Sequence, residues 1–143
     1  MKMMDAVEVL EGLRLVSTKD IGLFKLISSS NRAAKKDIYD LNFITEKIPI
    51  IELFEALRVK KNIFSKDEHK NIFDLDNDKC PSQYPLELLN FDNRSKKRNA
   101  IKPNHSNDHI IIIDDNKSWR MASIQWRMKL RKLYRYLDIV YPL

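Results

Sequence analysis

The sequence predicts a mainly α-helical protein with one or two short β-strands, built as a three-helix unit followed by a basic C-terminal helix. Apolar residues recur at helical spacing through long segments of the 143-residue chain. Only two glycines and five prolines are present, too few for a β-protein rich in turns. With 43% hydrophobic residues, a chain of this length can form one small domain with a modest core, or a smaller unit with a tail.

Two short strands are expected before the helices, at residues 7–9 and 13–16. Both segments combine Val or Leu with charged residues, and Gly12 lies between them at a turn. Two strands of this length form only a weak hairpin on their own. The segment 13–16 would then have an edge without a neighbouring strand.

The first helix is expected to begin near Thr18. Ser17 and Asp20 have the spacing of a capping box, in which the hydroxyl accepts from a free backbone N–H and the carboxylate returns a hydrogen bond. The polar run at residues 28–31 is expected to end this helix, because Ser and Asn side chains compete for backbone hydrogen bonds. Its apolar face is formed by Ile21, Leu23, Phe24, Leu26 and Ile27.

Two further helices complete the expected unit, which ends at about Lys61. The second restarts by Ala33 or Ala34 and has so much apolar surface that it must pack against its neighbours. Its apolar rows contain Ile38, Leu41 and Thr45, and next to them Tyr39, Phe43 and Ile44. The third begins at Pro49, since proline is tolerated in the first turn. Its buried face is expected to contain Ile50, Leu53, Phe54 and Leu57.

Four charged residues are expected to face one another across the first helical hairpin. Lys25 and Arg32 lie seven residues apart, and Asp37 and Asp40 form an i,i+3 pair on the second helix. One interpretation is an interhelical salt-bridge cluster that fixes the hairpin, a common arrangement that contributes little where it is exposed. The other is a functional site.

The same segment carries a family resemblance. Residues 12–44 resemble the late part of the nucleotidyltransferase domain of the AbiEii/AbiGii toxin family, whose members belong to toxin–antitoxin and phage-defence systems. The similarity covers roughly residues 10–60, under half of the chain. The matching positions are Gly12, Leu13, Arg14 and Leu15 in a strand, Asp20, Ile21, Lys25 and Leu26 in a helix, and Arg32, Lys36, Asp37, Asp40 and Leu41 in the next turn and helix.

The resemblance implies a polymerase-beta-like nucleotidyltransferase, which uses Mg²⁺ and a nucleoside triphosphate. By this analogy Lys25 contacts phosphate, Arg32 and Lys36 support it or meet the acceptor, and Asp37 or Asp40 orients the lysine or the acceptor. Transfer of this kind depends on positioning and charge neutralisation more than on covalent chemistry. The implied acceptor is tRNA or another RNA.

One departure from the family pattern affects the expected activity. Family members have a Gly-Ser turn and a D-x-D pair well upstream of the glycine-led strand, whereas Met1 here lies eleven residues before Gly12 and no Gly-Ser dipeptide occurs. We therefore expect the C-terminal portion of such an enzyme, as a truncated product or a separately encoded half. Alone it would be inactive and hold no cofactor, and its partners would be a cognate antitoxin or an N-terminal half.

No metal site is expected. Residues 74–78 have a D-x-D-x-D pattern, but the glycine and glutamate of a calcium loop are missing, so a solvated loop is the expectation. The three histidines share no ligand spacing with Cys80. A single cysteine and the lack of a signal peptide or an apolar run long enough for a membrane span indicate a reducing cytoplasm.

The positive charge belongs to the C-terminal third. Residues 94–135 contain twelve Lys and Arg against three Asp, a net of +9, whereas residues 1–93 have a net charge of −2. Residues 94–108 are expected to form a solvated linker, and residues 109–113 a β-branched strand that ends in two aspartates. A short helical turn at residues 86–91 is expected to pack on the core.

The last helix is expected to begin at Ser118 and to be amphipathic. Its apolar face is formed by Ala122, Trp126, Leu130, Leu133, Leu137 and Val140. The remaining surface carries the cations Arg120, Arg127, Lys129, Arg131, Lys132 and Arg135. The rings of Trp119, Trp126, Tyr134 and Tyr136 would stack on bases if they were exposed.

Several functions fit such a helix. It can be an ordinary core-facing helix with a solvated outer side, or it can bind a phosphate backbone, a membrane surface or an acidic groove of a partner. Among the functional interpretations the resemblance favours RNA. The expected organisation is a nucleotidyltransferase-like helical part at 1–62, an irregular and linker part at 63–108, and a strand with a basic helix at 109–143. The alternative function is a non-catalytic helical module that binds RNA or a partner.

Overall fold

The computed structural model describes residues 3–32, 34–69, 79–92 and 117–142. Within them the chain is mainly helical with one two-stranded antiparallel sheet, which confirms the predicted fold class. The strand expected at 109–113 and the linker at 94–108 lie outside the described residues. The elements in order are β1 (Glu8–Leu10), β2 (Leu13–Leu15), α1 (Thr18–Arg32), α2 (Lys35–Lys47), α3 (Ile50–Ile63), the 3₁₀ turns η1 (Asp67–His69) and η2 (Pro85–Asp92), and α4 (Trp119–Tyr136).

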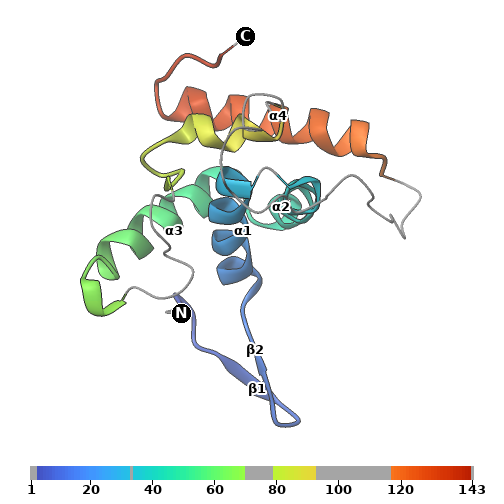
Figure 1. Ribbon diagram of the computed structural model, residues 1–143. Coiled ribbons are helices and arrows are strands. Elements are labelled where there is room, and N and C mark those ends of the chain that lie inside the picture. The colour runs from blue at the N-terminus through green and yellow to red at the C-terminus, as the bar shows by residue number, and fades with distance from the viewer. Residues whose placement is uncertain (1–2, 33, 70–78, 93–116, 143) are drawn as a thin grey trace.

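The three-helix unit forms one layer, and α4 with η2 covers it. Helix α1 packs against α2, α3 and η2, and α4 packs across α2 and α3 (Figure 1). The hairpin of β1 and β2 projects away from the helices at the other end of α1 (Figure 1). The single long segment that closes the core, α4, thus comes from the opposite end of the sequence.

One apolar core joins these elements. All four α-helices and η2 contribute fully or almost fully buried side chains to it. These include Leu23, Leu26, Ile38, Leu41, Leu53, Phe54, Leu57, Leu88, Phe91, Trp126, Leu130 and Leu133. The buried face predicted for α3 and the helical turn predicted at 86–91 are therefore confirmed. Phe43 was expected to pack against neighbours, but its side chain is exposed.

The prediction that the polar run ends α1 is wrong, because the helix continues through it to Arg32. The hydroxyl of Ser29 donates to the carbonyl of Leu26 at 3.0 Å, and that of Ser30 to the carbonyl of Ile27 at 2.7 Å. These bonds run back along the helix, so the hydroxyls are satisfied without displacing its backbone hydrogen bonds. The break comes at Ala34, which is extended (ψ 131°) before α2 begins.

The capping box is half confirmed. The Oγ atom of Ser17 accepts a hydrogen bond from the N–H of Asp20 at 3.0 Å, as predicted. The carboxylate of Asp20 contacts the cap through the Ser17 hydroxyl, which donates to Oδ2 at 3.4 Å. It also accepts from the backbone N–H groups of Met4 and Asp5, at 2.9 and 3.0 Å, so it fastens the N-terminal segment to α1.

The N-terminal hairpin has the register Glu8↔Leu15, Val9↔Arg14 and Leu10↔Leu13. Glu11 and Gly12 both have positive φ, 50° and 80°, which is the backbone of a tight two-residue turn whose twist matches the strands. Both strands are exposed throughout. The hairpin thus adds little to the core.

Helix α4 begins as predicted and ends earlier. The Oγ atom of Ser118 caps it by accepting from the N–H of Met121 at 3.3 Å. The apolar face was expected to reach Val140, but the helix ends at Tyr136 and Val140 is exposed. Among the described residues, none of the helices has the length and hydropathy needed to cross a membrane.

Candidate functional site

The structure brings together three of the residues singled out by the sequence. Lys25 on α1 lies between two carboxylates of α2, with its Nζ atom 3.0 Å from Oδ1 of Asp37 and 2.5 Å from Oδ2 of Asp40 (Figure 1 shows the two helices). The side chain of Asp37 is fully buried, whereas those of Lys25 and Asp40 are 26% and 48% exposed. The predicted contact across the hairpin is therefore present.

A fourth residue, Ser28, completes this cluster. Its hydroxyl donates to Oδ2 of Asp37 at 2.8 Å, so both oxygens of the buried carboxylate have a donor. Burial lowers the pKa of Lys25, but the hydrogen bonds and charges of Asp40 and Asp37 outweigh this effect and raise it above its usual value. The charged ammonium of Lys25 is thus held between α1 and α2, where it is partly exposed to solvent.

The other residues carried over from the family lie differently. Lys36 is exposed at the start of α2. The side chain of Arg32 falls outside the described part of the chain. The described residues contain no group of three or more His, Cys, Asp or Glu side chains arranged to hold a metal ion.

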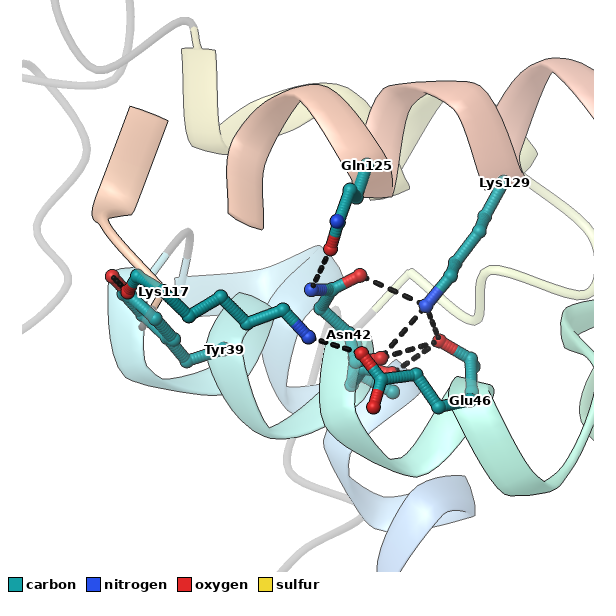
Figure 2. Close-up of polar contacts among 8 residues, drawn as sticks. Tyr39, Asn42, Glu46, Lys117, Gln125 and Lys129 are labelled. Atoms are coloured by element: carbon teal, nitrogen blue, oxygen red, sulfur yellow. Dashed lines mark hydrogen bonds and ion pairs between the residues drawn. The ribbon is translucent and has the colours of Figure 1, made fainter. Parts of the chain in front are cut away.

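The predicted nucleic-acid-binding residues include one whose ammonium is already occupied. Lys129 on α4 reaches across to α2, where its Nζ atom donates to the carbonyl and to Oδ1 of Asn42 at 2.7 and 2.8 Å, and to Oγ1 of Thr45 at 2.9 Å (Figure 2). Burial lowers its pKa, while the negative charge of Glu46 raises it by a smaller amount. Lys129 therefore fastens α4 to α2 instead of facing a ligand.

The same interface contains further polar contacts, which Figure 2 shows around Asn42. The side-chain amide of Asn42 donates to Oε1 of Gln125 at 2.9 Å, so this fully buried side chain is satisfied on both ends. Near the start of α4, Lys117 forms an ion pair with Glu46, and its carbonyl accepts from the hydroxyl of Tyr39 at 2.8 Å. The Lys117 ammonium lowers the pKa of Glu46.

The remaining cations of α4 lie on its outer side or at its flank. Arg127 is half-buried over the ring of Phe91, with 5.5 Å between guanidinium carbon and ring centroid, and Arg131 lies 5.2 Å from the ring centroid of Tyr141. The side chains of Arg120, Arg131, Lys132 and Arg135 are exposed.

The stacking role expected for the aromatic residues fails for two of the four. Trp126 and Tyr134 are buried in the core, where burial and the neighbouring Tyr141 raise the pKa of Tyr134 to about 12. Trp119 is half-buried between the rings of Tyr39 and Phe91. Tyr136 is exposed. A ladder of rings for successive bases is therefore absent from the described part of α4.

Sequence reasoning missed Asn42, Gln125 and the fastening role of Lys129. Two signals point to them in retrospect. Asn42 lies on the apolar face of α2, within one turn of Ile38 and Thr45, and Lys129 falls on the apolar face of α4 three residues after Trp126. A polar residue in such a row needs a partner from the facing helix.

Comparisons of this chain with protein families, with curated proteins and with solved structures found no match. The resemblance to the AbiEii/AbiGii family therefore rests on the pattern of residues between Gly12 and Leu41, and it stays a prediction.

Proposed function

We propose that this chain is the phosphate-contacting helical part of a nucleotidyltransferase similar to the AbiEii/AbiGii toxins, with an RNA such as tRNA as the acceptor. The observation that supports it is the position of Lys25. Its ammonium contacts both Asp37 and Asp40, and the resemblance implies that one of these carboxylates orients the lysine or the acceptor.

The two carboxylates differ in a way that suits this role. Asp37 is buried and also bound by Ser28, so it stays with Lys25 as a fixed support. Asp40 is half exposed, and a phosphate oxygen that reaches Lys25 can take its place. Because the cluster of one lysine and two aspartates has a formal charge of −1, it does not attract a triphosphate without a cation.

In such enzymes Mg²⁺ neutralises the triphosphate and polarises the reacting phosphorus. The Gly-Ser and D-x-D elements that would hold it do not occur together before Gly12 in this sequence. The proposal therefore concerns only the positioning residues of this chain. Lys25 contacts phosphate, and Lys36 and Arg32 support it or meet the acceptor.

The test is a transfer assay with labelled nucleotide, Mg²⁺ or Mn²⁺, and tRNA. The chain alone is expected to transfer nothing. When it is mixed with a Gly-Ser and D-x-D segment of an AbiEii-type enzyme, transfer is expected, and Lys25→Met should abolish it while the exposed Lys47→Met should not. Circular dichroism checks that both variants are folded. Transfer by the chain alone that Asp40→Asn abolishes would place the catalytic centre within this chain, and transfer that survives Lys25→Met would remove the lysine from the mechanism.

A second candidate is a non-catalytic module that binds RNA or a protein through α4. The observation in its favour is that Lys132 and Arg135 are exposed and form no ion pair with any other described residue. Helix α4 also contains no acidic residue. Lys132 and Arg135 thus remain available to an external anion.

A further inference from the structure

The outer side of α4 is not uniformly basic. Its N-terminal half exposes three apolar side chains, Met121, Ile124 and Met128, which are 49%, 43% and 55% exposed. Their spacing of three and four residues places them in one row along the helix. Single exposed apolar residues are common on protein surfaces, but a row with this spacing is typical of helices that pack against a second helix.

The C-terminal half of the same side carries charge. Arg131, Lys132 and Arg135 are exposed there, and the last two form no ion pair among the described residues. The row that begins with Met121, Ile124 and Met128 continues into these cations at the same helical spacing. The outer side of α4 is therefore apolar at one end and cationic at the other.

We infer that this outer side docks an amphipathic, acidic helix of a partner protein. The partner's apolar residues would cover Met121, Ile124 and Met128, and its carboxylates would face Arg131, Lys132 and Arg135. Unbranched methionines adapt to the shape of a docked helix, which suits two of the three apolar positions. Opposite charges at the other end fix the direction in which the partner lies. This inference deepens the second candidate function and does not depend on the role of Lys25.

The composition of this surface favours a protein over RNA. A phosphate backbone needs cations and gains nothing from an exposed apolar row. Bases would need a series of aromatic rings to stack on, but Trp126 and Tyr134 are buried and Trp119 is half-buried, which leaves one exposed ring on α4, that of Tyr136. A partner that has apolar side chains of its own accounts for the apolar half of the surface.

A second copy of this chain and a membrane fit less well. Two copies of α4 in parallel would place Arg135 against Arg135, and in antiparallel order Arg131 and Lys132 would lie on the apolar row of the other copy. Insertion into a membrane requires a wide apolar face. In α4 that face, which contains Trp126, Leu130 and Leu133, is already buried in the core.

The test selects ligands from a displayed library of helical peptides about 20 residues long, enough to span α4. The selected peptides are then titrated, as fluorescent probes, with the full chain and with three double variants. The first is Ile124→Asp with Met128→Asp in the apolar half, and the second is Lys132→Glu with Arg135→Glu in the cationic half. The third, Lys47→Glu with Lys66→Glu, is a control outside α4 with the same change of charge as the cationic-half variant. Fluorescent tRNA is titrated in parallel.

We expect the selected peptides to carry apolar residues at helical spacing together with Asp or Glu. Each α4 variant should weaken their binding about tenfold or more, as expected where a central contact is lost, and the control should leave it unchanged. The proposal is overturned if no acidic sequence is enriched, or if the selected peptides bind the α4 variants as tightly as the original chain. Loss of tRNA binding in the cationic variant, without any α4-dependent peptide, would assign the surface to RNA instead.

Discussion

Asp20 on α1 and Lys60 on α3 form a buried ion pair, with 3.0 Å between Oδ1 and Nζ. The Lys60 ammonium also lies 4.3 Å from the ring centroid of Phe24. The same carboxylate accepts from the backbone N–H groups of Met4 and Asp5. One side chain thus joins the N-terminal segment, α1 and α3, and its ionisation should be coupled to folding.

This coupling predicts a specific dependence of stability on pH. Burial raises the pKa of Asp20, but the N–H groups of Asp5 and Met4 and the Lys60 ammonium outweigh it, so the pKa lies below the ordinary 3.8. A carboxylate with a depressed pKa adds stability that is fully present above its unfolded-state pKa and is lost as the pH falls toward the folded-state value. Between about pH 5 and 3, the unfolding free energy should therefore fall more steeply in the original chain than in Asp20→Asn, by up to about 1.4 kcal/mol per pH unit.

Urea unfolding at a series of pH values measures this difference. Glu52→Gln is the matched control, because Glu52 is exposed on α3. The unfolding free energy of this variant should change with pH as it does in the original chain. Equal slopes for Asp20→Asn and the original chain would show that the carboxylate contributes no proton-linked stability.

The two aspartates that hold Lys25 should differ in their effect on stability. Asp37→Ala removes a buried carboxylate, strands the hydroxyl of Ser28 and leaves Lys25 with one partner, so we expect a loss of about 2 to 4 kcal/mol. Asp40→Ala leaves the buried partner of Lys25 in place and removes a half-exposed carboxylate, so it should cost at most about 1 kcal/mol. Urea unfolding of both variants tests the order, and a larger loss for Asp40→Ala would mean that Asp37 is not the main support.

The Lys25 cluster was predictable because its geometry is local. Asp37 and Asp40 share one side of α2 through their i,i+3 spacing, and a short connection forces α1 and α2 to pack side by side. The sequence therefore contained both the faces and the hairpin that brings them together. The same reasoning correctly placed the apolar faces of α3 and, as far as Leu137, of α4, which follow from helical periodicity alone.

The contacts that were missed join segments far apart in the sequence. Asp20 has the spacing of a local capping pattern, which gives no indication of its ion pair with Lys60, forty residues later. Asn42 and Lys129 are separated by 87 residues, and no local pattern determines that α4 crosses α2 at this point. Whether a cation of an amphipathic helix faces solvent or a neighbouring helix depends on where the two helices cross. The spacing of apolar residues does not determine that position.

Gly22 allows α1 to approach α3 and α2 closely. A Cβ atom at this position would lie 2.9 Å from Cδ1 of Leu53, closer than Cβ atoms come in folded proteins, and 3.2 Å from Cγ2 of Ile44, which is tighter than most such contacts. We expect Gly22→Ala to destabilise the fold by up to about 2 kcal/mol, because an overpacking cost of about 1 to 3 kcal/mol is offset by only the roughly 1 kcal/mol gained in helix propensity.

A double-mutant cycle tests whether this close approach is the cause. Leu53→Ala removes the methyl groups that the new Cβ would meet, so adding Gly22→Ala to it should cost little or even stabilise the chain. The unfolding free energies of the two single variants and of the double variant give the coupling. If the effects of the two substitutions simply add, contact with Leu53 is not what requires glycine at this position.

Lys129 should stabilise the fold, in contrast to the other lysine of α4. Replacing it with methionine keeps the length of the side chain but leaves Oδ1 of the buried Asn42 without the ammonium donor and removes the donor to Thr45. We expect Lys129→Met to lower the unfolding free energy by about 1 to 3 kcal/mol, the range for a buried polar group left unsatisfied. Lys132→Met, on the exposed side of the same helix, should change it by about 0.5 kcal/mol or less. Urea unfolding midpoints at unchanged m-value compare the two variants, and similar losses would mean that the contacts of Lys129 with α2 do not hold α4 in place.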